Sequence, residues 1–590
     1  MTMARLFAAS CMIAIVAGCA ATRDDGRLGS SVEPRDEKLV TGGRTGEEAV
    51  AVADAQNRVD RGRDVPAPPP PPPMAPVSAK MANQAYGTTS APAREIYAPS
   101  PGYAPSPGYA IPPVMVATDP GRERYQGEEV SAVHLTRAEP VSTFSVDVDT
   151  GAYANARRFL TQGQMPPRDA VRSEEMINYF RYDYARPADR AAPFSITTDV
   201  AVTPWNPGTR LLRIGLKGYD LPNEGRPPAN LVFLVDVSGS MNSPDKLPLV
   251  KAALSGLAGE LGRQDKVSIV VYAGAAGLVL EPTNDDRKIR AALDRLEAGG
   301  STAGAAGLKL AYNIARDNMI DGGVNRILIA TDGDFNVGVS DTKALIEMVE
   351  KERDHGITLT TLGFGTGNYN EAMMEQIADH GNGNYAYIDS ALEARKVLGE
   401  QMEATLFTIA KDVKIQVEFN PAQVSQYRLI GYENRALREE DFDNDKVDAG
   451  DIGAGHQVTA IYEIVPAGQK GWMAPRRYEE GRHDEPLPDA ARSKSSELAF
   501  VKLRYKLPNG DTSRLIERAV PANLLARSAL PTGDFAFATA VAAFGQALRG
   551  DEMLNGFDYA DIARLAGGQR DYWRQEFVRL VGVAGSLKGG

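Results

Sequence analysis

The sequence predicts an α/β protein in which a doubly wound, mostly parallel sheet is flanked by β-rich segments, the last of which ends in helices. Three observations support this prediction. The 590 residues exceed what one hydrophobic core usually holds. Between residues 230 and 405, apolar runs alternate with helical patterns, which is typical of a doubly wound sheet. On either side of that region, apolar residues recur with a period of two, which indicates half-buried strands.

The overall composition is that of a globular protein with an acidic balance. Hydrophobic residues make up 43% of the chain and charged residues 24%, and the formal net charge is −12. Proteins that bind nucleic acid normally carry a basic patch or a high pI. We therefore expect no nucleic-acid partner.

The first residues have the features of a leader peptide. Arg5 precedes an apolar run at 6–17 that is too short to span a bilayer but has the length of a signal-peptide core. The run ends in Val16-Ala17-Gly18-Cys19, which resembles the bacterial lipobox. This resemblance implies cleavage after residues 1–18 and lipidation of Cys19, and a plain secretory leader is the alternative.

The cysteine count limits the chemistry of the mature protein. Cys11 would leave with the leader and Cys19 would carry lipid, and the chain has 2 cysteines in all. Cysteine catalysis, cysteine metal ligation and a disulfide are then excluded. Ala20, rather than Asp, follows the lipidated position, which by resemblance to Gram-negative sorting favours the outer membrane. We expect a lipid-anchored protein of the cell envelope that faces the periplasm or the surface.

Residues 19–125 have the composition of a disordered tether. They contain six consecutive prolines at 68–73 and a hexapeptide repeat that begins at Tyr97 and again at Tyr103. Such a segment buries too little apolar surface to offset its ordering entropy, and its proline run favours polyproline II. We interpret it as a spacer, with a docking strip for a proline-binding partner as the alternative.

The segment at 126–229 is predicted to be an α+β unit associated with the central sheet. Its alternating patterns predict strands at 143–149, 194–202 and 211–217, and helical patterns occupy 153–162 and 171–182.

The central segment at 230–405 is predicted to form the doubly wound sheet. Its first strand, 231–235, is apolar throughout, as in a strand buried on both faces. Further strands are predicted at 267–272, 278–280, 326–330, 357–362 and 384–388, and helices at 246–261, 287–298, 303–316, 342–352, 371–379 and 391–404.

The segment at 406–590 is predicted to be β-rich with helices at its end. Strand patterns lie at 413–419, 427–432, 458–464 and 500–505, an exposed loop at 484–496, and helices at 533–549, 559–566 and 571–583. Both connections of the central segment are expected to leave at the entry edge of its sheet. We therefore expect the strands before residue 217 and after 406 to form one composite β-sandwich that supports the inserted sheet.

Oxygen-bearing side chains follow two of the predicted strands. Asp236, Ser238 and Ser240 come directly after the strand at 231–235, and Asp332 follows the strand at 326–330. Thr302 stands in a glycine-rich loop between two helices. Because ligands of doubly wound sheets bind beyond the carboxyl ends of the strands, these groups are expected to meet at one edge.

This pattern resembles the metal-ion-dependent adhesion site of von Willebrand A domains, which have a Rossmann-like fold. The resemblance implies that Ser238, Ser240 and Thr302 offer oxygens to a cation, and that Asp236 and Asp332 act directly or through water. Oxygen ligands with waters suit Mg²⁺ better than Ca²⁺, and Mn²⁺ is a further alternative. Ser301, Asp334 and Asn336 are expected to shape the site. The open coordination position would take a carboxylate from a protein partner, with no small-molecule substrate.

The chain also resembles bacterial lipoproteins in which a von Willebrand A domain lies between an associated N-terminal segment and a C-terminal domain of unknown function. The resemblance is carried by the sequences at 143–153, 175–180, 331–338 and 448–456. This family brings no established biochemical activity with it. From the adhesion-site pattern we expect a binding module and no enzyme. A metal-dependent hydrolase is the alternative, but no general base with a recognisable motif is present. A purely structural envelope role is the third possibility. The five histidines are scattered, and His456 is expected at the surface.

Overall fold

A computed structural model describes residues 123–146, 149–221, 226–301, 304–333, 342–367, 369–401, 404, 406–474 and 488–589. The predicted leader at 1–18, the lipidation site Cys19 and the tether up to residue 122 lie outside these ranges. The last three residues assigned to the tether belong to the fold. Glu123 pairs with Arg158 at 2.8 Å, and Arg124 forms a β-bridge with Asn370. Glu123 and Arg124 are therefore part of the folded chain.

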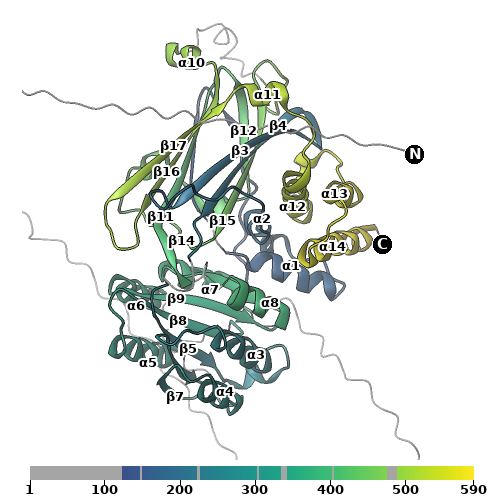
Figure 1. Cartoon of the computed structure of the whole chain (residues 1–590). Helices are drawn as coiled ribbons and strands as arrows, with labels where there is room; N and C mark the ends of the chain where they lie inside the picture. Colours follow the sequence, from purple (N-terminus) through teal and green to yellow (C-terminus); the bar gives the residue numbers. More distant parts are fainter. Residues whose placement is uncertain are drawn as a thin grey trace, which may run out of the picture. The chain divides into compact units, whose positions relative to one another are not determined.

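The central segment forms a six-stranded sheet, which confirms the predicted fold class (Figure 1). Its order is β10-β9-β8-β5-β6-β7, and every neighbouring pair is parallel except β6 and β7. The strands are β5 (Ala229–Asp236), β6 (Lys266–Tyr272), β7 (Ala276–Thr283), β8 (Val324–Thr331), β9 (Ile357–Phe364) and β10 (Tyr385–Ile388). The two strands that carry the candidate carboxylates, β5 and β8, are direct neighbours.

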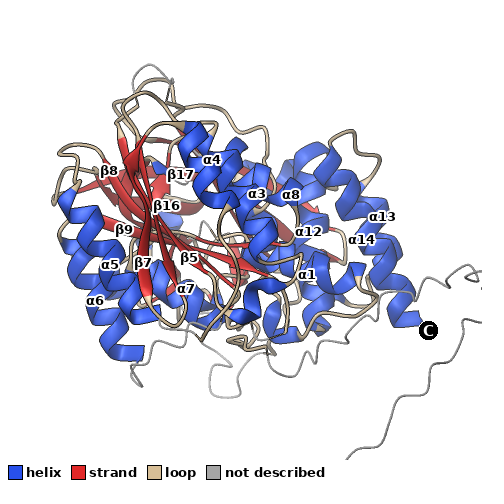
Figure 2. Cartoon of the chain, turned by 90° about the horizontal axis from the view of Figure 1, so that it is seen from below, coloured by secondary structure: helices blue, strands red, loops and turns tan. Residues whose placement is uncertain are grey.

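Helices cover both faces of this sheet (Figure 2). In β5, Leu231, Phe233 and Val235 pack on one face, and Val232 and Leu234 pack on the other. This is why the strand is apolar throughout. The first face is covered by α3 (Leu247–Ala258), α4 (Asp286–Asp294) and α8 (Ala391–Arg395), and the second by α5 (Gly304–Asp317), α6 (Thr342–Asp354) and α7 (Glu371–His380).

The last helix of this unit differs from the prediction of one helix over 391–404. The α-helical part, α8, ends at Arg395, and a π-helical turn, η5 (Lys396–Glu400), continues it. Lys396 is buried in that turn, with its ammonium 2.7 Å from the centroid of the Tyr179 ring. The periodicity of the sequence predicts a helix here but does not predict the change from α-helical to π-helical winding.

The flanking segments share two antiparallel sheets, as the composite hypothesis expected. The five-stranded sheet has the order β1-β12-β15-β4-β3. In the six-stranded sheet, five strands have the order β13-β2-β11-β16-β17, and the sixth, β14, pairs with β11 off this path. N-terminal strands in these sheets are β1 (His134–Leu135), β2 (Val141–Ser145), β3 (Phe194–Thr203) and β4 (Asn206–Gly218). C-terminal strands are β11 (Thr408–Phe419), β12 (Val424–Ile430), β13 (Ala436–Leu437), β15 (Gln457–Pro466), β16 (Glu497–Lys506) and β17 (Ser513–Pro521), and β14 (Ile452–Gly453) pairs with β11.

In both sheets, strands of the segment at 126–229 pair with strands of the segment at 406–590. β4 lies between its own hairpin partner β3 and the C-terminal strand β15, and β2 lies between β11 and β13. β17 was not predicted from the sequence, because most of its residues are exposed or half-buried and its alternation is weak. Each segment thus completes the sheets of the other.

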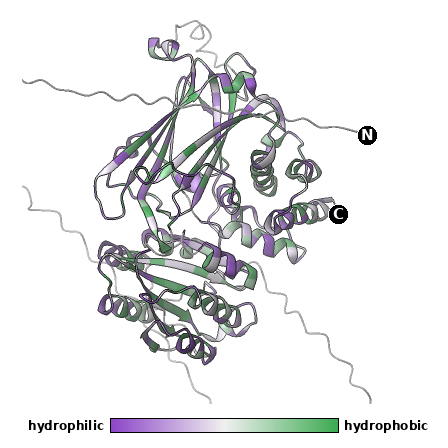
Figure 3. Ribbon diagram, in the orientation of Figure 1, coloured by the Kyte–Doolittle hydropathy of each residue, from purple (hydrophilic) through white to green (hydrophobic). Residues whose placement is uncertain are grey.

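The two sheets pack face to face around aromatic side chains. Phe144 of β2 lies 6.4 Å from Tyr462 of β15, and Phe419 of β11 lies 4.4 Å from Tyr427 of β12, measured between ring centroids. Hydrophobic and hydrophilic residues are interspersed along these strands (Figure 3). The alternating sequence pattern is therefore the pattern of strands with one face in this core.

Five helices form a layer on the side of the five-stranded sheet away from this core. They share a second hydrophobic cluster with Leu211 of β4 and Ile461 of β15. These helices are α1 (Gly151–Thr161), α2 (Ser173–Asn178), α12 (Gly533–Arg549), α13 (Tyr559–Ala566) and α14 (Tyr572–Gly589). The short helices α10 (Asp489–Ser493) and α11 (Asn523–Arg527) are not part of this cluster. In the part of the chain that the structure describes, no helix has the length and apolar character needed to cross a membrane.

Buried ion pairs join the central unit to the flanking helices. Arg172 beside α2 pairs with Glu371 and Glu375 of α7, at 3.4 and 2.7 Å. Arg157 of α1 pairs with Asp389 and Glu393 around the start of α8, at 2.6 and 2.8 Å. Because each guanidinium is almost inaccessible to solvent, these pairs are only weakly screened by salt. They fix the central unit against α1 and α2.

His456, which was expected at the surface, has its Nε2 atom buried, and no described residue forms a hydrogen bond with this atom. Burial, reinforced by Arg181 and Lys217, lowers the pKa of His456 to about 3. Between that value and the ordinary pKa of about 6.5, the unfolded chain binds a proton that the folded chain does not. Folding stability contributed by the neutral imidazole is therefore lost as the pH falls below about 6.5.

We expect the free energy of unfolding of the wild type to fall below pH 6.5 relative to that of His456→Asn, by at most roughly 1.4 kcal/mol per pH unit. Urea unfolding at pH 7.5, 6.5 and 5.5 measures the difference. The comparison with the variant cancels the titration of all other groups. Two pH profiles that run parallel through this range would contradict the prediction.

Candidate metal centre

Two carboxylates lie at the carboxyl edge of the central sheet. Asp236 is the last residue of β5, and Asp332 directly follows β8. The two strands run parallel with Val235 opposite Ala330, so both side chains emerge at the same edge. Asp236 is 0% exposed and Asp332 1% exposed. Two carboxylates in such a place are costly unless a cation or hydrogen bonds compensate for their burial.

The turn after β5 brings two hydroxyls beside Asp236. The backbone N–H of Ser238 donates a hydrogen bond to Asp236 Oδ1 at 2.8 Å, which closes the turn. The hydroxyls of Ser238 and Ser240 lie 3.0 Å apart, with Ser238 buried and Ser240 exposed. The predicted ligands Asp236, Ser238 and Ser240 are thus brought together on one turn.

A third hydroxyl-bearing residue, Thr331, forms a hydrogen bond with the other carboxylate oxygen of Asp236. Its Oγ1 donates to Asp236 Oδ2 at 3.1 Å and accepts a hydrogen bond from the backbone N–H of Gly333 at 3.2 Å. Thr331 was not predicted as a site residue. Its position at the end of β8, directly before Asp332, could have indicated that its hydroxyl lies at the site. Its hydroxyl positions Asp236.

The glycine-rich loop before Thr302 reaches the same turn. Gly299 donates its N–H to Val237 O at 2.7 Å, and Gly239 donates to Gly300 O at 3.1 Å. Gly300 has φ +86°, a conformation that favours glycine, which explains the glycine pair in this loop. Thr302 itself lies outside the described residues, as do Asp334 and Asn336. Ser301 is described and exposed.

The electrostatics of the edge also favour a cation. Burial raises the pKa of Asp236 to about 6, the charge of Asp332 adds to the increase, and hydrogen bonds from Ser238 and Thr331 oppose it. Asp332 is paired with the ammonium of Lys246 at 2.9 Å. Lys246 was not predicted as part of the site, because a lysine six residues after Ser240 carries no sign of being buried.

The donor set fits a small hard cation. It offers carboxylate and hydroxyl oxygens, which suit Mg²⁺, Mn²⁺ or Ca²⁺ better than softer metals. Within the described ranges, no three side chains among His, Cys, Asp and Glu are grouped so that they could hold a metal ion. The turn at Ser238 and Ser240 adds hydroxyl oxygens to the two carboxylates at this edge.

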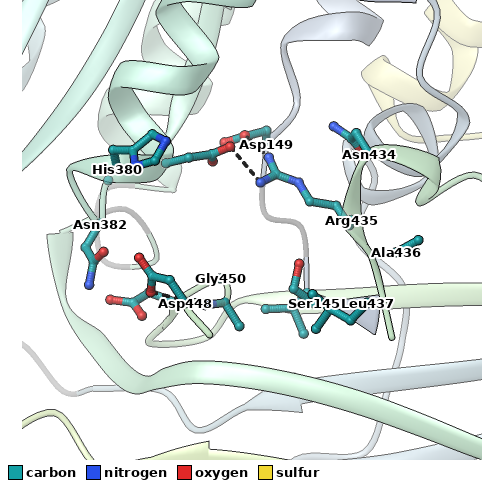
Figure 4. Close-up of a pocket in the computed structure, with 15 residues that line it drawn as sticks. Ser145, Asp149, His380, Asn382, Asn434, Arg435, Ala436, Leu437, Asp448 and Gly450 are labelled. Carbon is teal, nitrogen blue, oxygen red and sulfur yellow. Dashed lines mark hydrogen bonds and ion pairs between the residues drawn. The ribbon is translucent and has the colours of Figure 1, made fainter. Parts of the chain in front are cut away.

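A polar cavity of about 240 Å³ lies elsewhere on the molecule (Figure 4). Asn382 and Gly383, which line it, precede β10 and so belong to the opposite edge of the sheet. Asp149 and Arg435 face each other in it at 3.0 Å, and Asp448 of the segment at 448–456 borders it. The cavity is therefore separate from the candidate metal centre.

Comparisons with known proteins agree with the fold and site. The family described as von Willebrand factor type A domain matches residues 230–401. A family described as von Willebrand factor matches residues 119–213, and one described as uncharacterized protein YfbK, C-terminal, matches residues 404–587. The central unit with its Asp236 turn is a von Willebrand A domain, a class that commonly mediates metal-dependent protein interactions.

The likeness extends well beyond this domain. The chain is 48% identical over 481 residues to uncharacterized protein YfbK of Escherichia coli (strain K12), a match that covers 79% of this chain and 82% of the relative. The chain belongs to the YfbK family. The predicted arrangement of an A domain between an associated N-terminal segment and a C-terminal domain is confirmed.

Other matches cover less of this chain or have lower sequence identity. Uncharacterized protein sll0103 of Synechocystis sp. is 33% identical over 187 residues, which cover 31% of this chain and 43% of that protein. A solved structure described as von Willebrand factor type A from Catenulispora acidiphila matches 68% of this chain and 91% of its own, with a TM-score of 0.36 and 16% identity.

Proposed function

We propose that this protein is a metal-dependent protein-binding module that captures an acidic side chain of a partner through a divalent cation, and that it is not an enzyme. The observation that carries the proposal is the meeting of buried Asp236 and Asp332 with the Ser238 and Ser240 hydroxyls at one sheet edge. Ser238, Ser240 and Thr302 would supply oxygens, and the two aspartates would bind directly or through water. Mg²⁺ is the proposed cation, with Mn²⁺ and Ca²⁺ as alternatives.

The chemistry of the donors supports binding rather than catalysis. Hydroxyl ligands contribute no formal charge, so a bound divalent cation keeps much of its attraction for an incoming carboxylate. In a partly dry interface that attraction is much stronger than in water. The scaffold supplies what such a module needs, because the turn at 236–240 is tied by backbone hydrogen bonds to the loop at 299–300.

We further propose that the module is anchored to the cell envelope, in the outer membrane, by lipid on Cys19. The lipobox-like sequence at 16–19 and the small residue Ala20 support the anchor. The proline-rich segment that follows would act as a spacer between the lipid and the folded part. Labelling with a fatty-acid analogue in cells tests the anchor, and equal labelling of wild type and Cys19→Ser would overturn it.

Replacement of Asp236 by Asn is expected to weaken cation binding by roughly a hundredfold or more, because it removes one of the two buried charges that attract the ion. Isothermal titration of the folded protein with Mn²⁺ measures the dissociation constant directly. Asp286→Asn is a matched control, because Asp286 is 46% exposed and pairs only with Arg290 among the ion pairs of the described chain. Absence of Mn²⁺ uptake by the wild type would overturn the proposed function.

The same two variants, Asp236→Asn and Asp286→Asn, test whether partner binding depends on the cation. Capture from envelope extracts should be lost when a chelator is added and lost in Asp236→Asn, while Asp286→Asn captures as the wild type does. A protein captured equally by the wild type and both variants, with or without chelator, does not bind through the proposed cation. Such a result, together with Mn²⁺ uptake, would restrict the site to a structural role.

A further inference from the structure

The carboxylate of Asp332 forms an ion pair with the ammonium group of Lys246. Lys246 Nζ lies 2.9 Å from Asp332 Oδ2, and the lysine is 6% exposed and the aspartate 1%. A buried ion pair of this kind keeps its charges unscreened by water. Asp332 is one of the two carboxylates proposed to hold the metal. The positive charge of Lys246 therefore lies beside the proposed position of the divalent ion.

Local structure does not explain this lysine. Lys246 is the N-cap residue of α3, a position that prefers Ser, Thr, Asp or Asn. The N-terminus of a helix carries partial positive charge, so an ammonium there is unfavourable. The side chain makes no capping hydrogen bond. Its position is therefore maintained by tertiary contacts at the sheet edge rather than by the helix.

The loop that follows β9 leaves space for the side chain of Lys246. Gly365 follows β9 with φ +72°, and a Cβ at this position would collide with Cγ and Cε of Lys246. The Tyr387 hydroxyl donates a hydrogen bond to Gly365 O at 2.8 Å and fixes that loop. Because Gly365 has no side chain, there is room for the methylene groups of Lys246 to extend toward Asp332.

We propose that Lys246 is a resident counter-ion of the metal centre, whose ammonium competes with the divalent cation for Asp332. The inference rests on the proposed function and adds its regulation. Lys246 lowers the affinity for the cation, but it stabilises the two carboxylates when no cation is bound. With the cation in place, two carboxylates, one ammonium and a divalent ion leave these groups with a net positive charge. The centre then favours an anionic ligand, which selects an acidic partner.

The test compares cation affinity in variants that remove the charge. Lys246→Met and Lys246→Gln are expected to bind Mn²⁺ at least about tenfold more tightly than the wild type, because repulsion at short range in a buried site is lost. Lys246→Gln keeps a hydrogen-bond donor, so its comparison with Lys246→Met separates the effect of the charge from that of the hydrogen bond. Lys251→Met, which removes a lysine from the same helix whose ammonium bonds to Asp294 O, is the control and should bind as the wild type does.

A second readout uses thermal stability. Without Mn²⁺ both Lys246 variants should melt at a lower temperature than the wild type, and saturating Mn²⁺ should raise their melting temperature by more than it raises that of the wild type. Unchanged or weaker Mn²⁺ affinity in both variants, with normal uptake by the wild type and Lys251→Met, would overturn this inference alone. If neither the wild type nor any variant takes up Mn²⁺, the proposed function itself fails.

Discussion

Residues 404–590 expressed without residues 123–218 are expected to show no cooperative unfolding transition. The deletion removes β1, β3 and β4 from the five-stranded sheet and β2 from the six-stranded sheet. β15 would lose its ladder to β4, which runs from Gln457 opposite Lys217 to Ile464 opposite Arg210. The apolar faces that remain would have no partner sheet of sufficient size, and the exposed strand edges would favour aggregation. Circular dichroism during thermal and urea unfolding measures the transition.

Two further fragments complete this experiment. Residues 226–401 alone should melt cooperatively, because the six strands and their helices enclose hydrophobic clusters on both faces of the sheet. Coexpression of residues 123–218 with 404–590 should restore a soluble complex with a single transition. A cooperative transition in 404–590 alone would show that the C-terminal strands are independently stable and that β4 only adds to them.

The strands of the central sheet were predictable because their signal is local. An uninterrupted apolar run such as 231–235 reports burial on both faces, and the polar residues that follow it mark the carboxyl edge. Asp236 and Asp332 could therefore be placed at one edge from the amino-acid sequence alone, since parallel neighbours end together. In the flanks, a period of two shows which face of a strand is buried, but it does not identify the partner strand.

The charged contacts of the molecule could not be predicted in the same way. Lys246, Arg157 and Arg172 look like ordinary surface residues in the sequence, and all three are buried. Their burial depends on carboxylates that arrive from elements far away in the chain, such as Asp332 for Lys246 and Asp389 for Arg157. Long-range electrostatic pairing leaves no periodicity in a sequence, so this part of the site emerges only from the three-dimensional fold.

Replacement of Arg157 by Met is expected to lower the free energy of unfolding by about 3–5 kcal/mol, the range for breaking a buried ion pair from one side. Arg157 of α1 pairs with Asp389, Glu393 and Glu576, at 2.6, 2.8 and 3.0 Å. Methionine fills much of the volume but leaves three carboxylates without this cation in a site of low polarity. Urea unfolding monitored by tryptophan fluorescence measures the loss, and Trp573 lies close enough to report on it, 5.5 Å from the guanidinium carbon.

Arg290→Met serves as the control, because Arg290 and its partner Asp286 are about half exposed and such surface pairs contribute at most about 1 kcal/mol. Glu393→Gln introduced into Arg157→Met should recover part of the lost stability, because it removes one of the carboxylates left without a partner. Arg157 joins three elements, since Asp389 and Glu393 belong to the A domain and Glu576 belongs to α14. Its loss should therefore weaken the contact between the A domain and the composite sandwich. A single transition shifted by less than about 1 kcal/mol would show that packing alone holds the A domain to its support.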